Sequence, residues 1–181
     1  MRLQSSIALA TYNGEKYIAQ QLDSFARQTR LPDELVVSDD HSTDGTLDII
    51  ASFASTAPFA VKVVVNEGPR GFNRNFENAV RQCQYDVILF SDQDDVWFRE
   101  HVARLSSPFE EDTSLTIVIS NSQWWMTRRS LSTIQPWRPT GFPLLCYVER
   151  TLREESNSSS TCGTGCLWGM AWLFDLFSCP T

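Results

Sequence analysis

The chain has 181 residues, of which 42% are hydrophobic and 20% are charged, and its net charge at pH 7 is -7. This composition is typical of one globular domain with a sizeable core and excludes an intrinsically disordered chain. The acidic balance argues against a nucleic-acid partner, because phosphate backbones select basic surfaces.

Short apolar runs alternate with segments of helical periodicity up to about residue 120. The apolar runs predict strands at 6–10, 34–38, 61–65, 85–90 and 115–120. Apolar side chains recur at helical spacing in segments 17–25, 47–53 and 72–80, and Ser42 or Thr43 could cap the second of these helices. The alternation predicts βαβ units and a mostly parallel sheet in an α/β fold. Because the runs are continuous, the strands should be covered on both faces.

The N-terminus lacks the long apolar segment of a signal peptide, and the longest apolar run, near 166–177, is too short to span a bilayer. The five cysteines show no paired CxxC spacing, so neither a zinc site nor a disulfide framework is indicated. We therefore expect a cytoplasmic protein.

Polar clusters follow four of the predicted strands, at 11–14, 39–46, 66–73 and 91–95. Each cluster alone is better explained as an ordinary turn or helix cap. In an open parallel sheet, however, ligands bind beyond the carboxyl ends of the strands, so the four clusters would converge on one cleft. Together they favour a functional site.

The last cluster reads SDQDD and places three carboxylates, those of Asp92, Asp94 and Asp95, within four positions. Like charges this close raise each other's proton affinity. Hard divalent cations prefer carboxylate oxygens, and Mg²⁺ usually takes one or two from the protein and the rest from phosphate and water. A shared cation would relieve the repulsion and bind a diphosphate. The competing interpretation is a solvated turn with a helix N-cap at Asp94 or Asp95, which accounts for one acid better than for three.

Three stretches of the chain, TYNGEKYIAQQLDS, VVSDDHSTDGT and LFSDQDDVW, resemble the N-terminal half of family 2 glycosyltransferases over about residues 4–120. The nearest resemblance is to rhamnosyltransferase-like members of bacterial surface-polysaccharide synthesis. It implies a GT-A fold, which is Rossmann-like, and inverting hexosyl transfer from a dTDP- or UDP-sugar to a glycan or lipid-linked acceptor. Such an acceptor would bring the chain to the inner face of the membrane.

The resemblance also implies roles for residues of the first two clusters. Thr11, Tyr12 and Asn13 would line the nucleotide pocket. Asp39 would contact the base, and Asp40 would lie close by.

For the SDQDD cluster, the resemblance implies a metal and ribose site. Asp92 would face the ribose, and Asp94 would hold Mg²⁺ or Mn²⁺ against the diphosphate. Asp95 and Trp97 would shape the donor site. Two further candidates in the neighbourhood are Arg70 and Asn75.

Inverting transfer also needs a general base that takes the proton of the acceptor hydroxyl. In this family that carboxylate lies in the C-terminal half, and no residue of this chain matches it. Glu149 and Asp175 are available acids, but nothing places them, so the catalytic residue is unknown.

The composition changes after residue 121, since five of the six tryptophans and four of the five cysteines lie beyond residue 123. Reading segments 123–127 and 168–175 one base back restores stretches similar to the family, which favours a frameshifted tail beginning near 121–124. The competing interpretation is a genuine, short acceptor-binding segment. We expect a donor-binding domain at 1–121 and an atypical, poorly packed tail at 122–181, and hence a truncated enzyme.

Three functions stay open. The first is a glycosyltransferase, the second is a non-catalytic nucleotide-sugar-binding fragment, and the third is a metal-dependent nucleotidyltransferase. The third is weakened because the chain has no GxxxxGK[ST] loop, and its acids lack the basic neighbours expected around a nucleoside triphosphate.

Overall fold

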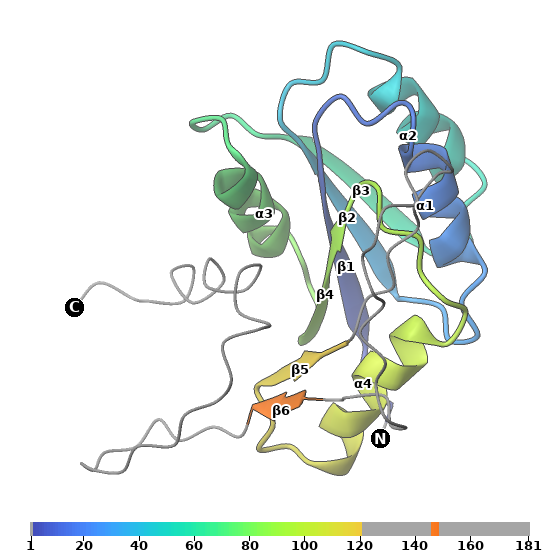
Figure 1. The fold of residues 1–181 in the computed structure, drawn as a ribbon, viewed down its shortest axis with the longest axis vertical. Helices are drawn as coiled ribbons and strands as arrows, with labels where there is room; N and C mark the ends of the chain where they lie inside the picture. The colour runs from blue at the N-terminus through green and yellow to red at the C-terminus, as the bar shows by residue number, and fades with distance from the viewer. Residues whose placement is uncertain (1, 121–145, 149–181) are drawn as a thin grey trace, which may run out of the picture.

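The computed structural model describes residues 2–120 and 146–148. Its centre is a four-stranded parallel sheet in the order β3-β2-β1-β4 (Figure 1). The strands are β1 (Ser5–Thr11), β2 (Glu34–Asp39), β3 (Ala60–Val65) and β4 (Val87–Asp92). This arrangement confirms the predicted α/β fold with a mostly parallel sheet.

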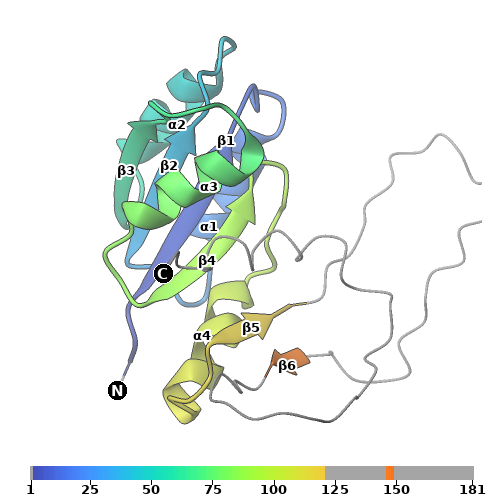
Figure 2. The ribbon, with the colours of Figure 1, turned by 90° about the vertical axis from the view of Figure 1, so that its left-hand side faces the viewer.

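Helices cover both faces of this sheet (Figures 1 and 2). One face carries α1 (Ile18–Ala26), α2 (Thr46–Ala54) and α4 (His101–Glu111), and the opposite face carries α3 (Phe72–Arg81). Side chains of a strand alternate between the two faces. Leu9 and Leu35 therefore pack in the core under α1, whereas Ala8 and Val36 pack against Ala79 of α3.

The prediction of strands covered on both faces is confirmed for β1 and β2, in which every residue is buried. It is wrong for β3, where Val63 and Val65 are 42% and 44% exposed. The reason is the strand order, because β3 lies at the edge of the sheet and has only β2 as a neighbour. The sequence pattern alone does not distinguish an edge strand from a central one.

Three elements differ from the predictions. The fourth strand extends to Asp92 because Leu9 and Ala10 of β1 pair with Ser91 and Asp92 beyond the apolar run. Helix α4 was not predicted, although its apolar residues recur at helical spacing; Pro108 lies inside it. The fifth strand, β5 (Ile117–Ile119), pairs antiparallel with an unpredicted strand, β6 (Cys146–Val148).

Neither the predicted helix cap at Ser42 or Thr43 nor the alternative cap at Asp94 or Asp95 is present. Helix α2 begins at Thr46 with Gly45 at the cap position, and neither Ser42 nor Thr43 caps it. The helix after the acidic cluster begins only at His101, so Asp94 and Asp95 do not cap a helix. The helix N-cap in the competing interpretation is therefore excluded, whereas its solvated turn agrees with the exposed Asp94 and Asp95.

Apart from the strand at 146–148, the expected tail at 122–181 lies outside the described residues, as do the acids Glu149 and Asp175. Among the residues that the structure does describe, no helix has the length and apolar character needed to cross a membrane.

Candidate functional site

The polar clusters converge at the carboxyl edge of the sheet, as expected. β1 lies between β2 and β4, and these strands end at Thr11, Asp39 and Asp92. The register pairs Thr11 with Asp39 and Ala10 with Asp92, so the loops that follow emerge side by side. Hydrogen bonds then join these loops into one network.

Asp39 is the most deeply buried member of this network, with no exposed surface. Its Oδ2 atom accepts hydrogen bonds from the hydroxyls of Thr11 at 2.9 Å and Ser42 at 2.6 Å, and its Oδ1 atom accepts one from the backbone N–H of Ser42 at 2.7 Å. These bonds explain why Ser42 is not a helix cap: its side chain is bound to Asp39 instead. The carboxylate of Asp39 faces protein groups on both oxygens.

Asp40 joins the ends of two further segments. Its Oδ1 accepts a hydrogen bond of 2.9 Å from the side-chain amide of Asn66, which follows β3. Its Oδ2 accepts one of 2.9 Å from the backbone N–H of Gly71, which precedes α3. Gly71 has a φ of 140°, a conformation that L side chains rarely adopt, so a glycine is needed at this point. Asp40 therefore fixes the start of α3 at the sheet edge.

The loop after β1 is held against the loop after β2. The N–H of Asn13 donates to the hydroxyl of Ser42 at 2.9 Å, and Oδ1 of Asn13 accepts a bond of 2.8 Å from the N–H of Thr43. Asn13 has a φ of 47°, which asparagine tolerates better than most residues. The neighbouring Tyr12 is 50% exposed, so its ring is accessible to a ligand.

Gln93 ties the same loop to the SDQDD cluster. Its Oε1 accepts a hydrogen bond of 2.9 Å from the N–H of Tyr12, and its Nε2 donates one of 3.1 Å to the carbonyl of Tyr12. Gln93 is not among the predicted site residues, because a glutamine between acids carries no signal of its own. Only the structure shows that its side chain turns toward β1.

The three acids of SDQDD lie at the surface or near it, with Asp94 and Asp95 exposed and Asp92 half-buried. Burial, together with the charges of Asp94 and Asp95, raises the pKa of Asp92. Burial and the charge of Asp94 likewise raise the pKa of Asp95. Among the residues that the structure describes, none of these three acids forms an ion pair.

This donor set fits a hard cation. Within the described residues, no three His, Cys, Asp or Glu side chains are grouped so that they could hold a metal ion by themselves. A magnesium-type ion, however, usually needs only one or two protein carboxylates and completes its shell with phosphate and water. The exposed carboxylate of Asp94 meets that requirement, and a cation there would also offset the charges that raise the pKa values of Asp92 and Asp95.

Trp97 lies in the hydrophobic core, where it is 8% exposed. Its ring meets Phe25 edge-on at a centroid distance of 4.7 Å, and its backbone N–H donates a hydrogen bond of 3.1 Å to the hydroxyl of Ser24. These contacts of Trp97 therefore hold the loop that contains SDQDD against α1. Any influence on a donor would act through the position of that loop.

The two further candidates differ in exposure. Arg70 is exposed, whereas Asn75 is 3% exposed. The amide Nδ2 of Asn75 donates a hydrogen bond of 3.0 Å to the carbonyl of Thr11. Its Oδ1 has no hydrogen-bond partner among the described residues. Asn75 thus connects α3 to the end of β1.

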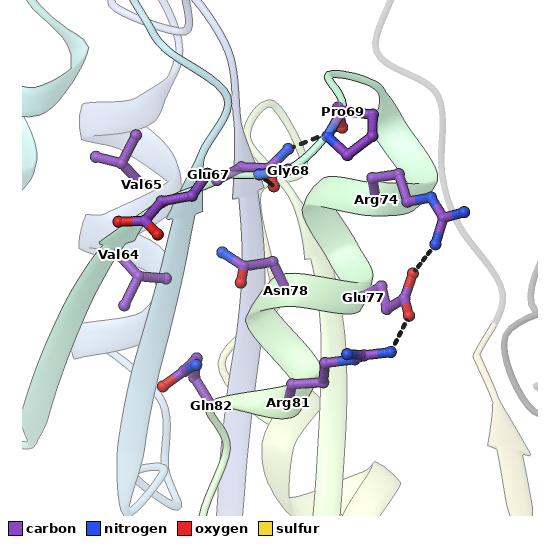
Figure 3. Close-up of a pocket in the computed structure, with 11 residues that line it drawn as sticks. Val64, Val65, Glu67, Gly68, Pro69, Arg74, Glu77, Asn78, Arg81 and Gln82 are labelled. Carbon is purple, nitrogen blue, oxygen red and sulfur yellow. Dashed lines mark hydrogen bonds and ion pairs between the residues drawn. The ribbon is translucent and has the colours of Figure 1, made fainter.

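A groove of about 700 Å³ lies beside this network, between the end of β3 and α3 (Figure 3). Residues of its wall include Val64, Glu67 and Asn78, and none of the predicted site residues lines it. On α3, Glu77 lies between Arg74 and Arg81 and forms ion pairs with both. A hydrogen bond from Arg74 and the charge of Arg81 lower the pKa of Glu77, so the charges on this rim are paired with one another.

Comparison with known proteins finds glycosyltransferases among the relatives of this chain. The dTDP-rhamnosyl transferase RfbG of Shigella flexneri is 36% identical over 98 residues, which are 52% of this chain and 34% of that protein. The poly(ribitol-phosphate) beta-N-acetylglucosaminyltransferase TarS of Staphylococcus aureus is 33% identical over 120 residues, which are 65% of this chain and 21% of that protein. The match thus spans about a third or less of the length of these relatives.

Solved structures share the fold. A crystal structure of S. aureus TarS in complex with UDP has a TM-score of 0.59 and 30% identity, and the match covers 72% of this chain and 38% of that one. The mannosyltransferase PcManGT of Pyrobaculum calidifontis, in complex with GDP-Man and Mn²⁺, has a TM-score of 0.57 and 28% identity, over 64% of this chain and 34% of that one.

The sequence profile described as Glycosyl transferase family 2 matches residues 6–175. The match covers nearly the whole chain, and part of the atypical segment after residue 121 falls within it. The chain belongs to glycosyl transferase family 2 and has the GT-A fold.

Proposed function

We propose that the chain is the donor-binding part of a glycosyltransferase, which moves a sugar with inversion from a nucleotide-diphosphate donor to a glycan acceptor. The observation that carries the proposal is that the loop of Tyr12, whose side chain is exposed, is hydrogen-bonded through Gln93 to the acidic SDQDD cluster, in a chain of this family. Two relatives give the expected donor class, since TarS was crystallised with UDP and RfbG is named a dTDP-rhamnosyl transferase. Rhamnose is accordingly the first sugar to test.

Asp94 is the proposed ligand for Mg²⁺ or Mn²⁺. Its carboxylate is exposed, and it is one of the charges that raise the pKa values of Asp92 and Asp95. A divalent cation supplies positive charge that holds a diphosphate and stabilises it as a leaving group. Two structural relatives, PcManGT and a mycobacterial glucosyl-3-phosphoglycerate synthase, were solved with Mn²⁺.

The other site residues would bind and orient the nucleotide. The proposed pocket consists of Thr11, Tyr12 and Asn13, with Asp92 facing the ribose and Asp95 beside it. Asp92 is half-buried at the end of β4, which supports a hydrogen-bond acceptor for a nucleotide at this edge of the sheet. The exposed aromatic ring of Tyr12 offers a face on which a base can stack.

Two neighbouring acids, Asp39 and Asp40, lie at the end of β2, and their burial bears on the roles proposed for them. A direct contact between Asp39 and the base stays a prediction, and it requires the side chain of Thr11 or Ser42 to move away, since Asp39 has no exposed surface. In the arrangement described, Asp39 holds Thr11 and Ser42 in place. Asp40, at 7% exposure, lies nearer to the surface.

A second candidate function is a non-catalytic nucleotide-sugar-binding fragment. The match spans 34% of RfbG and 21% of TarS, so the activity of a whole relative is itself only a proposal for this chain. The two acids considered as general bases, Glu149 and Asp175, lie outside the described residues. The division into a donor domain at 1–121 and a separate tail at 122–181 belongs to the same proposal.

Donor turnover distinguishes the two functions. The full chain would be incubated with dTDP-rhamnose or UDP-sugars, a panel of glycan and lipid-linked acceptors, and Mn²⁺ or Mg²⁺, and the release of nucleoside diphosphate would be measured. Transfer that is lost in Asp94→Asn but kept in the exposed control Asp86→Asn supports the enzyme. Binding without transfer supports the fragment. Failure to bind any nucleotide or nucleotide sugar would overturn both.

A further inference from the structure

We propose that Gln93 is a positioning residue that makes nucleotide binding depend on cation binding at the neighbouring acids. This inference rests on the proposed function of the site. Gln93 lies between Asp92 and Asp94, and its side chain holds the loop after β1 against the loop after β4. The ligand concerned is a nucleoside diphosphate with a divalent cation.

Two hydrogen bonds join the side chain of Gln93 to the backbone of Tyr12. One side-chain amide satisfies both backbone groups of Tyr12, with its Oε1 accepting at 2.9 Å and its Nε2 donating at 3.1 Å. The backbone pairing of β1 with β4 ends at Ala10 and Asp92. The side chain of Gln93 thus continues the connection between the two strands beyond the point where their backbone pairing stops.

The amide of Gln93 occupies the space where Gly14 has no side chain. A Cβ atom on Gly14 would lie 2.3 Å from Oε1 and 2.7 Å from Cδ of Gln93, far inside van der Waals contact. Gly14 does not have a positive φ, so its backbone conformation does not by itself require glycine. The next atom that a Cβ would meet, Cγ of Gln93, is at 3.4 Å, an ordinary contact. The missing side chain of Gly14 therefore makes room for the amide of Gln93.

The connection between Gln93 and Tyr12 lies between two groups that a ligand would touch. On one side, Tyr12 presents its half-exposed ring. On the other side, Gln93 is covalently next to Asp92 and Asp94, and its N–H donates to Oδ1 of Asp92 at 3.2 Å. A cation that orders the acids thereby orders Tyr12 through Gln93. Two ligands that order the same segment bind with positive cooperativity.

The connection can be tested without any ligand, by thermal unfolding of the full chain in a double-mutant cycle. Gly14→Ala should lower the melting temperature by about 2–4 °C, because the added methyl group displaces the amide of Gln93 and breaks its two hydrogen bonds with Tyr12. In the Gln93→Ala background the same substitution should have no effect or raise the melting temperature, because the collision is gone and alanine restricts the unfolded chain. An equal loss in both backgrounds would overturn the assignment.

The coupling is tested by calorimetric titration with UDP and with dTDP, each with and without Mn²⁺. In the wild type, Mn²⁺ should strengthen nucleotide binding, and Gln93→Ala should reduce that enhancement about tenfold, the size expected for two hydrogen bonds. The matched control is Gln84→Ala, an exposed glutamine before the opposite end of β4. A change in fold stability alone would weaken binding equally with and without Mn²⁺.

The outcomes separate this inference from the proposed function. If the wild type binds neither UDP nor dTDP, the proposed function fails and the coupling fails with it. If nucleotides bind and Gln93→Ala keeps the full enhancement by Mn²⁺, only the coupling is overturned.

Discussion

The hydroxyl of Thr11 donates a hydrogen bond of 2.9 Å to Oδ2 of Asp39, and both side chains are buried where neighbouring strands end. The carboxylate has no access to water, so its protein donors replace its hydration. Removing one of them leaves a buried charge less well solvated, which costs more free energy than losing an exposed hydrogen bond.

Thr11→Val is therefore expected to lower the free energy of unfolding by about 2 kcal/mol, the usual size for a hydrogen bond to a charged group. Urea denaturation measures this loss. The matched control is Thr29→Val, since the hydroxyl of Thr29 donates to the carbonyl of Arg99 at an exposed site. That control should change stability by less than about 0.5 kcal/mol. Equal losses would show that Asp39 does not depend on Thr11.

Gly71→Ala is expected to destabilise the start of α3. Gly71 has a φ of 140°, and a Cβ there would meet nothing within 4 Å, so the effect comes from backbone strain alone. The expected loss in free energy of unfolding is about 1–3 kcal/mol. Gly68→Ala serves as the control, because Gly68 has no positive φ and its Cβ would approach only Oδ1 of Asn66, at 3.3 Å. A loss in the control as large as in Gly71→Ala would refute the strain.

Asp94→Asn should stabilise the chain in the absence of a divalent cation. Burial and neighbouring charge raise the pKa values of Asp92 and Asp95, so the folded state holds their protons more tightly than the unfolded state. The free energy of unfolding therefore falls as pH rises from the ordinary value of 3.8 through the raised pKa values. Removing the charge of Asp94 reduces that fall.

The gain in Asp94→Asn at pH 7 should be a few tenths of a kcal/mol, as for other exposed charge interactions. Denaturation curves at several pH values, with Asp86→Asn as the control, measure it. The prediction also requires that Mn²⁺ raises the melting temperature of the wild type and leaves that of Asp94→Asn unchanged. A metal-free Asp94→Asn protein less stable than the wild type would contradict the proposed repulsion.

His101 should make the fold sensitive to mild acid. Burial lowers the pKa of His101 from 6.5 to about 4, and its ring packs on Trp97 at a centroid distance of 4.3 Å. Between these two values the unfolded state binds a proton that the folded state does not. The free energy of unfolding should therefore have its highest value above pH 6.5. It should fall by an amount on the order of 2 kcal/mol as the pH drops toward 4.

His101→Phe keeps an aromatic ring against Trp97 and removes the titrating group. Its stability should change less between pH 7 and pH 4 than that of the wild type. If His101→Phe and the wild type have the same profile, another group causes the acid sensitivity.

Most of the secondary structure was readable from the sequence because each element carries its own local pattern. The apolar runs of β1 and β2 and the helical spacing of α1 are determined by residues close in the chain. Helix α4 was missed although Val102, Leu105 and Phe109 recur at helical spacing. The end of β4 was misplaced because pairing with β1, rather than apolar character, determines how far the strand continues.

The candidate site was predictable in position but not in its contacts. Parallel strands bring their carboxyl ends to one edge, so the clusters containing Tyr12, Asp40 and Asp94 could be expected to meet there. The hydrogen-bond partners of these side chains depend on the directions in which the side chains point, which short motifs do not encode. The link from Gln93 to Tyr12 crosses 81 residues of sequence, and the burial of Trp97 in the core depends on its contact with Phe25.

The central claim is that this sheet edge binds a nucleoside diphosphate together with a divalent cation held by Asp94. Calorimetric titration of the full chain with UDP and dTDP, in Mn²⁺ and again in EDTA, tests it most directly. We predict binding in Mn²⁺ that is weakened at least about tenfold by EDTA and by Asp94→Asn, but not by Asp86→Asn. Binding that Asp94→Asn abolishes and EDTA leaves intact would contradict the metal role, and no binding of either nucleotide would contradict the claim as a whole.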